Sequence, residues 1–263
     1  DDPAPVPAWQ RTGDPRGEIT LRRLLQMSSG LDHTETAEAG GKTVFQADTN
    51  RMLFLDGAQN VAAYAEARPM EAMPGEKFEY STATSMILSD IITRTLTRST
   101  DPQVRHDVTL RFIRGRLLEP LGMDSTYPEF DPSGTFLGGS IIQATARDYA
   151  KFGEFLRHKG ARKGAQHLPV SWVRFMTTSS QNDPAYGAHL WLNKNRPEGR
   201  NPVLFPDDGP DTIFAALGHL GQQIVVSPDQ QLTVVRLGKT QDDVLAPMSA
   251  QIGRIMALFP IRG

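Results

Sequence analysis

The sequence contains no cysteine among its 263 residues. This absence excludes disulfide frameworks, thiolate nucleophiles and cysteine-ligated zinc, but it does not assign a compartment. The sequence also lacks any apolar run near the roughly 18 residues that a membrane-spanning helix needs. Its first residues, DDPAPVPAWQ, have neither the basic nor the apolar region of a secretion signal. We therefore expect no membrane span and no signal in this chain, and because it begins without Met we expect processing or truncation upstream.

A strong net charge is lacking too. The 28 Lys and Arg residues and the 30 Asp and Glu residues leave a formal charge of -2, and the isoelectric point is about 6.3. Since no clustered run of Lys or Arg makes a basic patch, nucleic acid is not expected as a partner. The hydrophobic content of 39% and the charged content of 22% are those of an ordinary globular protein. At this length the chain holds one large domain or two intimate ones.

The clearest strand pattern lies between residues 212 and 238. Three short runs rich in Ile and Val, at residues 213–217, 222–226 and 232–237, are separated by turn-forming residues. Gly218 and Gly221 flank the first break, and SPDQ at residues 227–230 makes the second. This spacing predicts an antiparallel meander. Because the runs are nearly continuous in apolar residues, we expect helices to cover both of its faces.

Helical patterns fill most of the chain before the meander, and one follows it. A proline-rich lead-in at residues 1–19 is expected to run extended over a surface. The expected helices are one from Thr20 as N-cap to Gly30 as stop, then residues 50–55, 60–67, 86–96 and 104–118, one opened by Thr145, and one capped by Ser171. Residues 186–192 alternate as a half-buried strand would, and residues 194–211 form a loop. The last helix, residues 247–259, should cover the meander with Met248, Ile252, Ile255, Met256 and Phe259.

Three side chains have positions that suit either a site or simple packing. Tyr80 is expected at a junction between a loop and a helix, where a phenol can point into a cleft or pack with its hydroxyl on a neighbour. His219 stands between two glycines, where backbone N–H groups can approach a ligand, or is a histidine at the end of a strand in a glycine-rich hairpin. For His33 we expect an exposed loop position rather than one lining a cleft.

Several segments, taken in order, resemble the serine hydrolases related to class C β-lactamases and penicillin-binding proteins, in their esterase or 6-aminohexanoate-dimer-hydrolase-like branch. They are ITLRRLLQMSSGL, PGEKFEYST, EPLGMDST, GGSIIQATARDYAKF, YGAHLW and GHLGQ. The resemblance spans about residues 15 to 240. It implies an α+β fold with a helix-rich region at residues 20–200 packed on an antiparallel sheet with a C-terminal helix, residues 201–263. Residues 1–19 would be the lead-in of the α/β part.

The resemblance also implies an activity and a site. Members of the family hydrolyse small esters or amides through an acyl-enzyme, without a cofactor or metal, and tend to be periplasmic or exported. In this sequence Tyr80 would be the general acid and base, and Thr82 the side-chain donor that replaces the usual Asn. His219 would stand in for the lysine of the third motif, and the N–H of Gln222 would serve the oxyanion hole. The residues placed near the substrate are Gly221, Tyr186 and Trp191.

The nucleophile of such an enzyme is missing from this sequence. In the family a Ser-x-x-Lys pair on one helix supplies it, and here no lysine has a serine three positions before it. A Gly-x-Ser-x-Gly elbow and a His-Glu-x-x-His zinc motif are absent as well. We expect the motif upstream of Asp1, so that the 263 residues are a fragment that is inactive by itself. The alternative is a non-catalytic relative that binds a peptidoglycan-type ligand or a protein partner.

Overall fold

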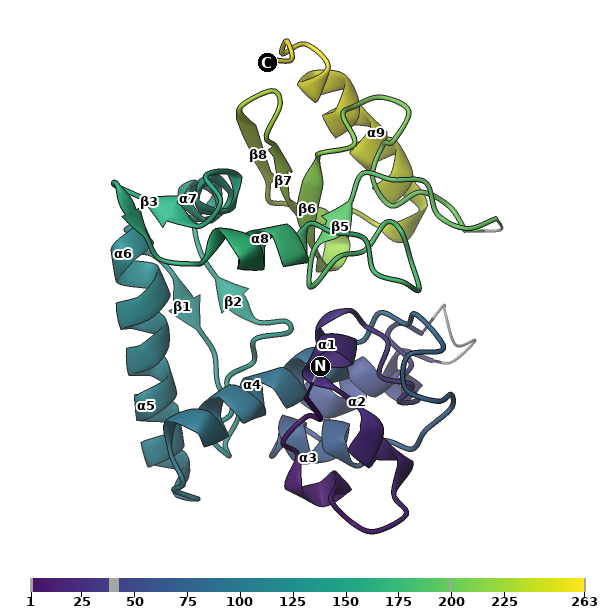
Figure 1. Cartoon of the computed structure of the whole chain (residues 1–263), viewed down its shortest axis with the longest axis vertical. Helices are drawn as coiled ribbons and strands as arrows, with labels where there is room; N and C mark the ends of the chain where they lie inside the picture. Colours follow the sequence, from purple (N-terminus) through teal and green to yellow (C-terminus); the bar gives the residue numbers. More distant parts are fainter. Residues whose placement is uncertain (1, 38–42, 199, 263) are drawn as a thin grey trace. The chain divides into compact units, whose positions relative to one another are not determined.

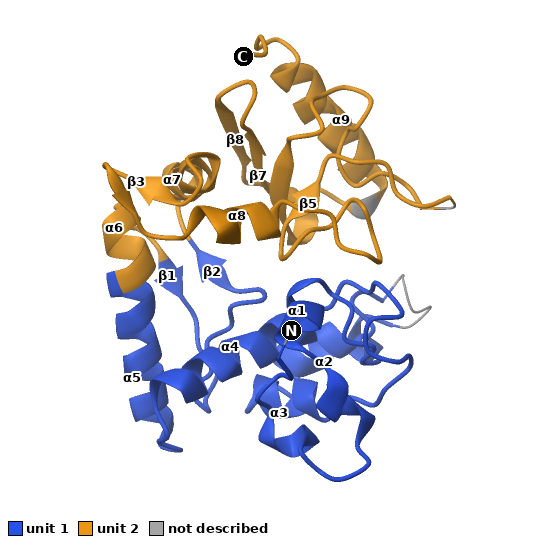
Figure 2. Ribbon diagram, viewed as in Figure 1, with its two compact units in different colours: residues 1–115, 127–143 blue, residues 116–126, 144–263 orange. Residues whose placement is uncertain are grey.

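The computed structural model describes residues 2–37, 43–198 and 200–262, and it divides into two compact units. Unit 1 comprises Asp1–Gly115 and Tyr127–Gln143, and unit 2 comprises Arg116–Thr126 and Ala144–Gly263 (Figure 2). The chain therefore passes from one unit to the other after residues 115, 126 and 143. The division expected at residues 20 and 201 stays a prediction.

Unit 1 is mainly helical. Its helices are α1 (Leu21–Leu25), α2 (Asp48–Phe54), α3 (Val61–Glu66), α4 (Thr82–Leu96) and α5 (Pro102–Ile113), and the strands β1 (Tyr127–Pro128) and β2 (Ile142–Gln143) pair antiparallel (Figure 1). Thr20 caps α1 as expected, by accepting a hydrogen bond from the Arg23 N–H. The end expected at Gly30 is wrong, because Met27 already leaves the helical region with a φ of 55°.

The lead-in belongs to the core of unit 1, so the surface path expected for it is wrong. Val6, Trp9 and Ile19 are buried, and they pack in one cluster with residues of α1 to α4. The Trp9 indole N–H donates to the Glu66 carbonyl oxygen at 2.9 Å, which satisfies the polar atom of that ring. Pro7–Trp9 and Pro15–Glu18 form short 3-10 turns. Since each large apolar side chain stabilises by roughly 1.5–3 kcal/mol when buried, the segment contributes to the stability of the unit.

Unit 2 contains the sheet. Its elements are α6 (Glu119–Leu121), α7 (Ala146–Arg157), β3 (Ala161–Arg162), β4 (Ala165–Gln166), α8 (Val170–Met176), β5 (Trp191–Leu192), β6 (Phe214–Gly218), β7 (Gln222–Ser227), β8 (Leu232–Arg236) and α9 (Leu245–Met256). A π-helical segment, Arg114–Leu118, joins α5 to α6. Thr145 caps α7 by accepting from the Asp148 N–H, as predicted. Ser171 lies inside α8 and caps nothing there, because α8 begins at Val170 after Pro169.

The predicted meander is confirmed. The strand order is β5-β6-β7-β8 and each neighbouring pair is antiparallel. Ala216 lies opposite Ile224 between β6 and β7, and Val225 lies opposite Val234 between β7 and β8. Each strand thus pairs with the next one along the chain, and tight turns join β6 to β7 and β7 to β8.

Helices cover both faces of this sheet, as expected (Figure 1). On one face Gly153 of α7 lies so close that an added Cβ would meet Thr233 Cγ2 at 2.6 Å and Ile224 Cγ2 at 3.0 Å. On the other face Ile252 and Met256 of α9 pack in a cluster with strand residues. The set of covering residues expected for α9 was partly wrong, because Ile255 and Phe259 are 42% and 45% exposed. Within the described ranges, none of the helices combines the length and apolar character needed to cross a membrane.

Candidate active site

Tyr80 and Thr82 lie where an extended segment of unit 1 becomes α4, as predicted for Tyr80. The Glu79 N–H donates to the Met27 carbonyl oxygen at 2.8 Å and holds the extended segment in place. Ser81 is the N-cap, and its hydroxyl accepts from the Thr84 N–H at 3.3 Å. Tyr80 is therefore presented one residue before the cap of a long helix.

A carboxylate engages both donors of Thr82. Glu35 Oε1 accepts from the Thr82 hydroxyl at 2.5 Å, and Glu35 Oε2 accepts from the Thr82 N–H at 2.7 Å. A negative group is favourable at this position, because the first N–H groups of a helix carry a partial positive charge. The hydroxyl has one proton, and it is directed to Glu35. In this arrangement Thr82 does not supply the free side-chain donor that was expected from it.

Glu35 is itself held by the loop after α1 and by α2. Its Oε2 accepts from the Thr49 hydroxyl at 3.1 Å and lies 3.1 Å from His33 Nε2. Because an ionised carboxylate only accepts, the hydrogen of the imidazole is assigned to Nε2. The expectation that His33 is exposed was wrong, since its side chain is 0% exposed. The buried imidazole also contacts α2, because the Thr49 hydroxyl lies 2.9 Å from its Nε2.

These contacts set the charges around Tyr80. Burial acts to raise the pKa of Glu35, but hydrogen bonds from the His33 and Thr82 side chains and from the Thr82 N–H outweigh it and lower the pKa below its ordinary value. Burial, followed by the negative charge of Glu35, raises the pKa of Tyr80 to about 12. At neutral pH this corner of unit 1 therefore holds a carboxylate and a neutral phenol.

A second pair of carboxyl groups precedes Tyr80. Lys77 Nζ lies 2.7 Å from Glu71 Oε1 and 3.0 Å from Glu79 Oε2, so one ammonium serves two acids. Burial, the Glu71 carboxyl and its charge together raise the pKa of Glu79 to about 7, against the opposing effect of Lys77. Glu79 thus changes its protonation near neutral pH, one residue before the tyrosine.

In unit 2, His219 and Gly221 lie in the turn between β6 and β7. His219–Gly221 is a 3-10 turn, in which Leu220 has a φ of 57° and Gly221 a φ of 83°. His219 is exposed and Gly221 is buried. Glycine suits position 221 because of this positive φ, and because an added Cβ would approach Arg236 Nη1 at 3.0 Å.

Gln222 opens β7, and its side chain folds back on the turn. Its Nε2 donates to the carbonyl oxygens of His219 at 3.0 Å and Gly238 at 2.6 Å, while its Oε1 accepts from the Gly238 N–H at 2.9 Å. The side chain thus fixes the turn and leaves any contribution to a ligand to the backbone. In the register of the sheet Gln222 pairs with Gly218.

Tyr186 and Trp191 meet, although not along one strand. Their rings lie edge to face with centroids 4.9 Å apart. The alternation expected over residues 186–192 correctly marks Ala188, Leu190 and Leu192 as buried, but the strand is wrong apart from β5. His189 has a φ of 57°, which turns the chain back so that Tyr186 bridges to Trp191. Tyr186 is 1% exposed, so Trp191, which is partly exposed, offers more surface to a ligand.

The same turn contains a histidine that the sequence analysis did not single out. Burial lowers the pKa of His189 to about 4, so that its imidazole is neutral at physiological pH. Among the described residues its Nε2 is buried without a hydrogen-bond partner. No local pattern marks this residue, because its burial depends on how the turn folds.

A serine and a lysine do meet in unit 2, at positions that no Ser-x-x-Lys pattern could reveal. Lys194 Nζ donates to Ser179 Oγ at 2.9 Å, and the Ser179 hydroxyl donates to the Pro184 carbonyl oxygen at 2.8 Å. A lysine that donates to the oxygen cannot at the same time accept its proton, and the serine proton is directed elsewhere. This pair is arranged to hold a turn rather than to activate a nucleophile.

A hollow in the described part of unit 1 is not lined by Tyr80. It is a cavity of about 360 Å³ between the start of α5 and the strand β1 with the loop after it, and its lining includes His106, Tyr127 and Phe130. None of the predicted site residues lines it. Over residues 2–37, 43–198 and 200–262, no cluster of three or more acidic or histidine side chains could hold a metal ion.

A family model described as Beta-lactamase matches residues 1–251. A Bacillus anthracis protein named as a 6-aminohexanoate-dimer hydrolase is similar in structure, with a TM-score of 0.69 and 20% sequence identity, over 95% of this chain and 64% of that one. This chain thus spans less than two thirds of that relative. No protein in the curated set matches.

Two further solved structures have the same fold. One is a penicillin-binding protein homologue from Caulobacter crescentus, with a TM-score of 0.64 and 14% identity over 95% of this chain and 74% of that one. The other is a family VIII carboxylesterase, with a TM-score of 0.60 and 14% identity over 94% of this chain and 74% of that one. The predicted α+β, β-lactamase and transpeptidase-like fold is therefore confirmed.

Proposed function

We propose that this chain, which belongs to the beta-lactamase family, is the larger part of a serine hydrolase that cleaves a small ester or amide through an acyl-enzyme. The observation that carries the proposal is the position of Tyr80 one residue before the N-cap of α4, in a chain that matches the family over residues 1–251. The names of two structural relatives, a 6-aminohexanoate-dimer hydrolase and a carboxylesterase, support a linear amide or an ester as the substrate class.

The nucleophile is proposed to come from outside these 263 residues. The sequence contains no Ser-x-x-Lys, and the chain covers 64% of the Bacillus anthracis relative. The spatial pair of Ser179 and Lys194 does not replace the motif, because its serine proton is committed to a carbonyl oxygen. By itself the chain is therefore proposed to be inactive. The periplasmic or exported location typical of the family is part of this proposal.

The proposed roles follow the chemistry of each group. Tyr80, a neutral phenol at neutral pH, serves as the general acid toward the leaving group and as the base once it has lost its proton. The Gln222 N–H stabilises the oxyanion, and His219 takes the place of a lysine. Trp191, with Gly221, lies near the substrate. Thr82 positions the motif through Glu35 rather than donating to the substrate, because its hydroxyl proton is directed to that carboxylate.

The absent motif favours one second candidate. A relative that lost its nucleophile would keep the fold and bind a peptidoglycan-type ligand or a protein partner without turnover. The two candidates differ in what a fluorophosphonate does to the full-length protein. Under the main proposal one serine of an upstream Ser-x-x-Lys is labelled stoichiometrically, whereas labelling of any serine within residues 1–263 would show that the nucleophile was misplaced. A protein that takes up no label and hydrolyses no ester would be the non-catalytic relative.

Replacing Tyr80 by Phe tests its role in the full-length protein. We expect turnover to fall by about 10² to 10⁴ while the melting temperature changes little, because only a proton carrier is removed. Tyr127→Phe is the matched control, since Tyr127 is 63% exposed and has no proposed role. If Tyr80→Phe lowers stability and leaves the activity per folded molecule intact, Tyr80 is a packing residue.

A further inference from the structure

One stretch of unit 2 carries positive charge and no acidic residue. Residues 155–182 contain no Asp or Glu, although the whole chain has a formal charge of -2. The basic residues of this stretch are Arg157, Lys159, Arg162, Lys163 and Arg174. Arg157 is paired with Glu154 at 2.6 Å, but the other four have no acidic partner among the residues that the structure describes. Their charge is thus not neutralised by a neighbouring carboxylate.

Three of these charges lie on or beside the small hairpin of β3 and β4, between α7 and α8 (Figure 1). Lys159 precedes β3, Arg162 ends it, and Lys163 begins the two-residue turn to β4. The Gly160 carbonyl oxygen accepts from the Leu168 N–H at 3.1 Å, which ties the base of the hairpin to the segment before α8. At roughly 3.3 Å per residue, the backbone places Lys159 and Lys163 no more than about 13 Å apart. Both lysines are exposed, and Arg162 is half-buried.

The backbone at the two lysines favours other residues. Lys159 has a φ of 54° and Lys163 a φ of 50°, in the left-handed region that Gly and Asn adopt more readily. The end of α7 accounts for a cation at position 159, because a helix C-terminus attracts positive charge. It does not account for Lys163 at the tip of the hairpin. A lysine at this strained position indicates that its charge serves more than the fold.

The helix α8, directly after the hairpin, adds exposed apolar side chains. Val170 is 41% exposed and Trp172 is 44% exposed, although the Trp172 ring lies 5.5 Å from that of Phe175 between centroids. Arg174 on the same helix is exposed as well. Lysine and arginine attract anionic headgroups, and tryptophan is favoured at the level of those headgroups. The combination indicates a lipid surface, because a purely charged partner would leave Val170 and Trp172 unexplained.

We propose that the basic surface formed by Lys159, Arg162, Lys163, Val170 and Trp172 binds the headgroup region of an anionic lipid bilayer. The basic side chains attract the negative headgroups, and Trp172 enters the interface beside them, so that the protein lies on the membrane without crossing it. Because the formal charge of the whole chain is -2, the attraction depends on this surface and not on the net charge. The inference does not rest on the hydrolase function proposed above.

Sedimentation with lipid vesicles tests the proposal in the full-length protein. The protein should bind vesicles that contain phosphatidylglycerol, bind pure phosphatidylcholine vesicles far less, and be released by about 0.5 M salt. The double variant Lys159→Asn and Lys163→Asn removes two charges and places at both positions a residue that accepts a positive φ, so its melting temperature should not fall. Its affinity for the anionic vesicles should fall by about 30-fold, because each lysine near such a surface contributes roughly fivefold.

The matched control is the double variant Arg11→Gln and Arg111→Gln, which removes two exposed charges from unit 1 and should leave the binding unchanged. Tryptophan emission then tells a lipid surface from another anionic partner. On the anionic vesicles it should shift to shorter wavelength in the parent, and Trp172→Phe should remove that shift. Binding to soluble heparin without any shift on vesicles would assign the surface to a polyanion and overturn the proposal. The proposal is also wrong if the parent does not bind the anionic vesicles, or if the Lys159 and Lys163 double variant binds them as the parent does.

Discussion

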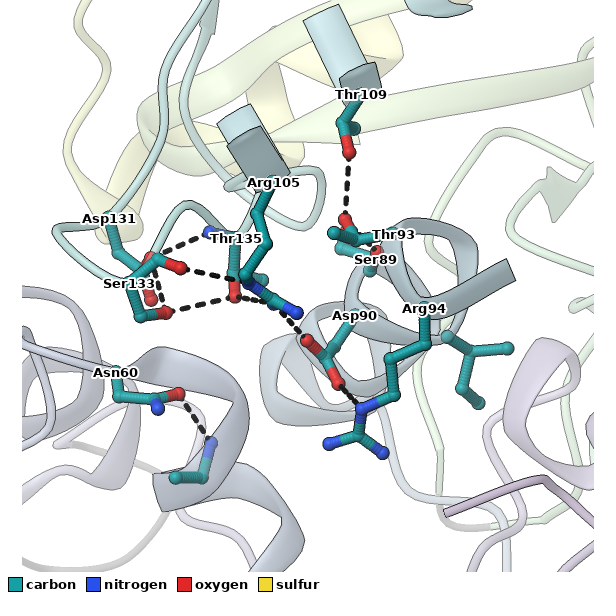
Figure 3. A network of polar contacts seen from close by, with 12 residues as sticks. Asn60, Ser89, Asp90, Thr93, Arg94, Arg105, Thr109, Asp131, Ser133 and Thr135 are labelled. Carbon is teal, nitrogen blue, oxygen red and sulfur yellow. Dashed lines mark hydrogen bonds and ion pairs between the residues drawn. The ribbon is translucent and has the colours of Figure 1, made fainter. Parts of the chain in front are cut away.

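Replacing Arg105 by Met tests how unit 1 supports the helix that carries Tyr80. Arg105 of α5 reaches α4 and the loop after β1 at once (Figure 3). Its Nη2 donates to Asp90 Oδ1 at 2.5 Å, and its Nε donates to the Ser133 carbonyl oxygen at 2.9 Å. The side chains of Arg105 and Asp90 are only 12% and 3% exposed. Methionine keeps much of the apolar stem and removes the charge.

The magnitude follows from what remains after the substitution. Removing one partner of a buried ion pair costs about 3–5 kcal/mol. Arg94 Nε stays 2.6 Å from Asp90 Oδ2, so the lower value, about 3 kcal/mol, applies. Ser133 O and the Thr135 hydroxyl also lose a charged donor, which adds about 1 kcal/mol. The free energy of unfolding should fall by about 4 kcal/mol, and the melting temperature by about 8 °C.

Calorimetry on the full-length protein measures the melting temperature, and hydrogen exchange of the α4 and α5 amides shows whether unit 1 is the part affected. Arg111→Met is the matched control on the same helix, because Arg111 is exposed, and it should change stability by less than about 0.5 kcal/mol. A melting temperature within about 2 °C of the parent, with unchanged exchange in α4, would refute the reasoning. It would mean that Arg94 alone satisfies Asp90.

Three further predictions concern other parts of the chain. A carboxyl with a higher pKa in the folded than in the unfolded chain favours folding while it is protonated, so the raised pKa of Glu79, about 7 against 4.5, should cost stability as the pH rises through that range. Glu79→Gln should therefore have about the same melting temperature as the parent near pH 5 and a higher melting temperature near pH 8, as thermal unfolding at both pH values would show. Gly187→Ala places a Cβ 1.9 Å from a carbonyl oxygen at the end of α8 and should cost about 3 kcal/mol in urea unfolding, whereas Gly115→Ala, with nothing within 4 Å, should not destabilise. Thr82 and His219 stand where the sequence resemblance implies an Asn amide and a lysine ammonium. Without those two groups a β-lactam should be held less well, so under the proposed function the full-length protein should prefer p-nitrophenyl butyrate to nitrocefin, and a clear preference for nitrocefin would contradict this.

Features decided over a few residues could be predicted from the sequence. The meander follows from strand periodicity and turn residues, and the Thr145 cap from a side chain and an N–H three residues apart. The prediction of a strand at residues 186–192 was wrong for a local reason as well. Its alternation was real, but His189 adopts a positive φ that no periodicity reports.

The contacts that matter most around Tyr80 were out of reach. Glu35 and Thr82 are 47 positions apart, and the pattern around Glu35 resembles that of any polar loop. His33 was misplaced for the same reason, because its burial depends on contacts with Glu35 and with Thr49. A motif can identify Tyr80, but only the fold shows which carboxylate faces the turn that holds it.

The three passages of the chain between the units have a consequence for synthesis on the ribosome. Unit 1 cannot be completed until residue 143 has been made, and by then residues 116–126 have already been made without the rest of unit 2. Ser125, whose N–H and hydroxyl both donate to Asp148, must wait for that carboxylate to be translated. No single cut of the chain separates one complete unit from the other, so a truncation from either end leaves at least one unit incomplete. Because domains generally fold as units from the N-terminus during synthesis, this chain must delay part of its folding until its last third has emerged.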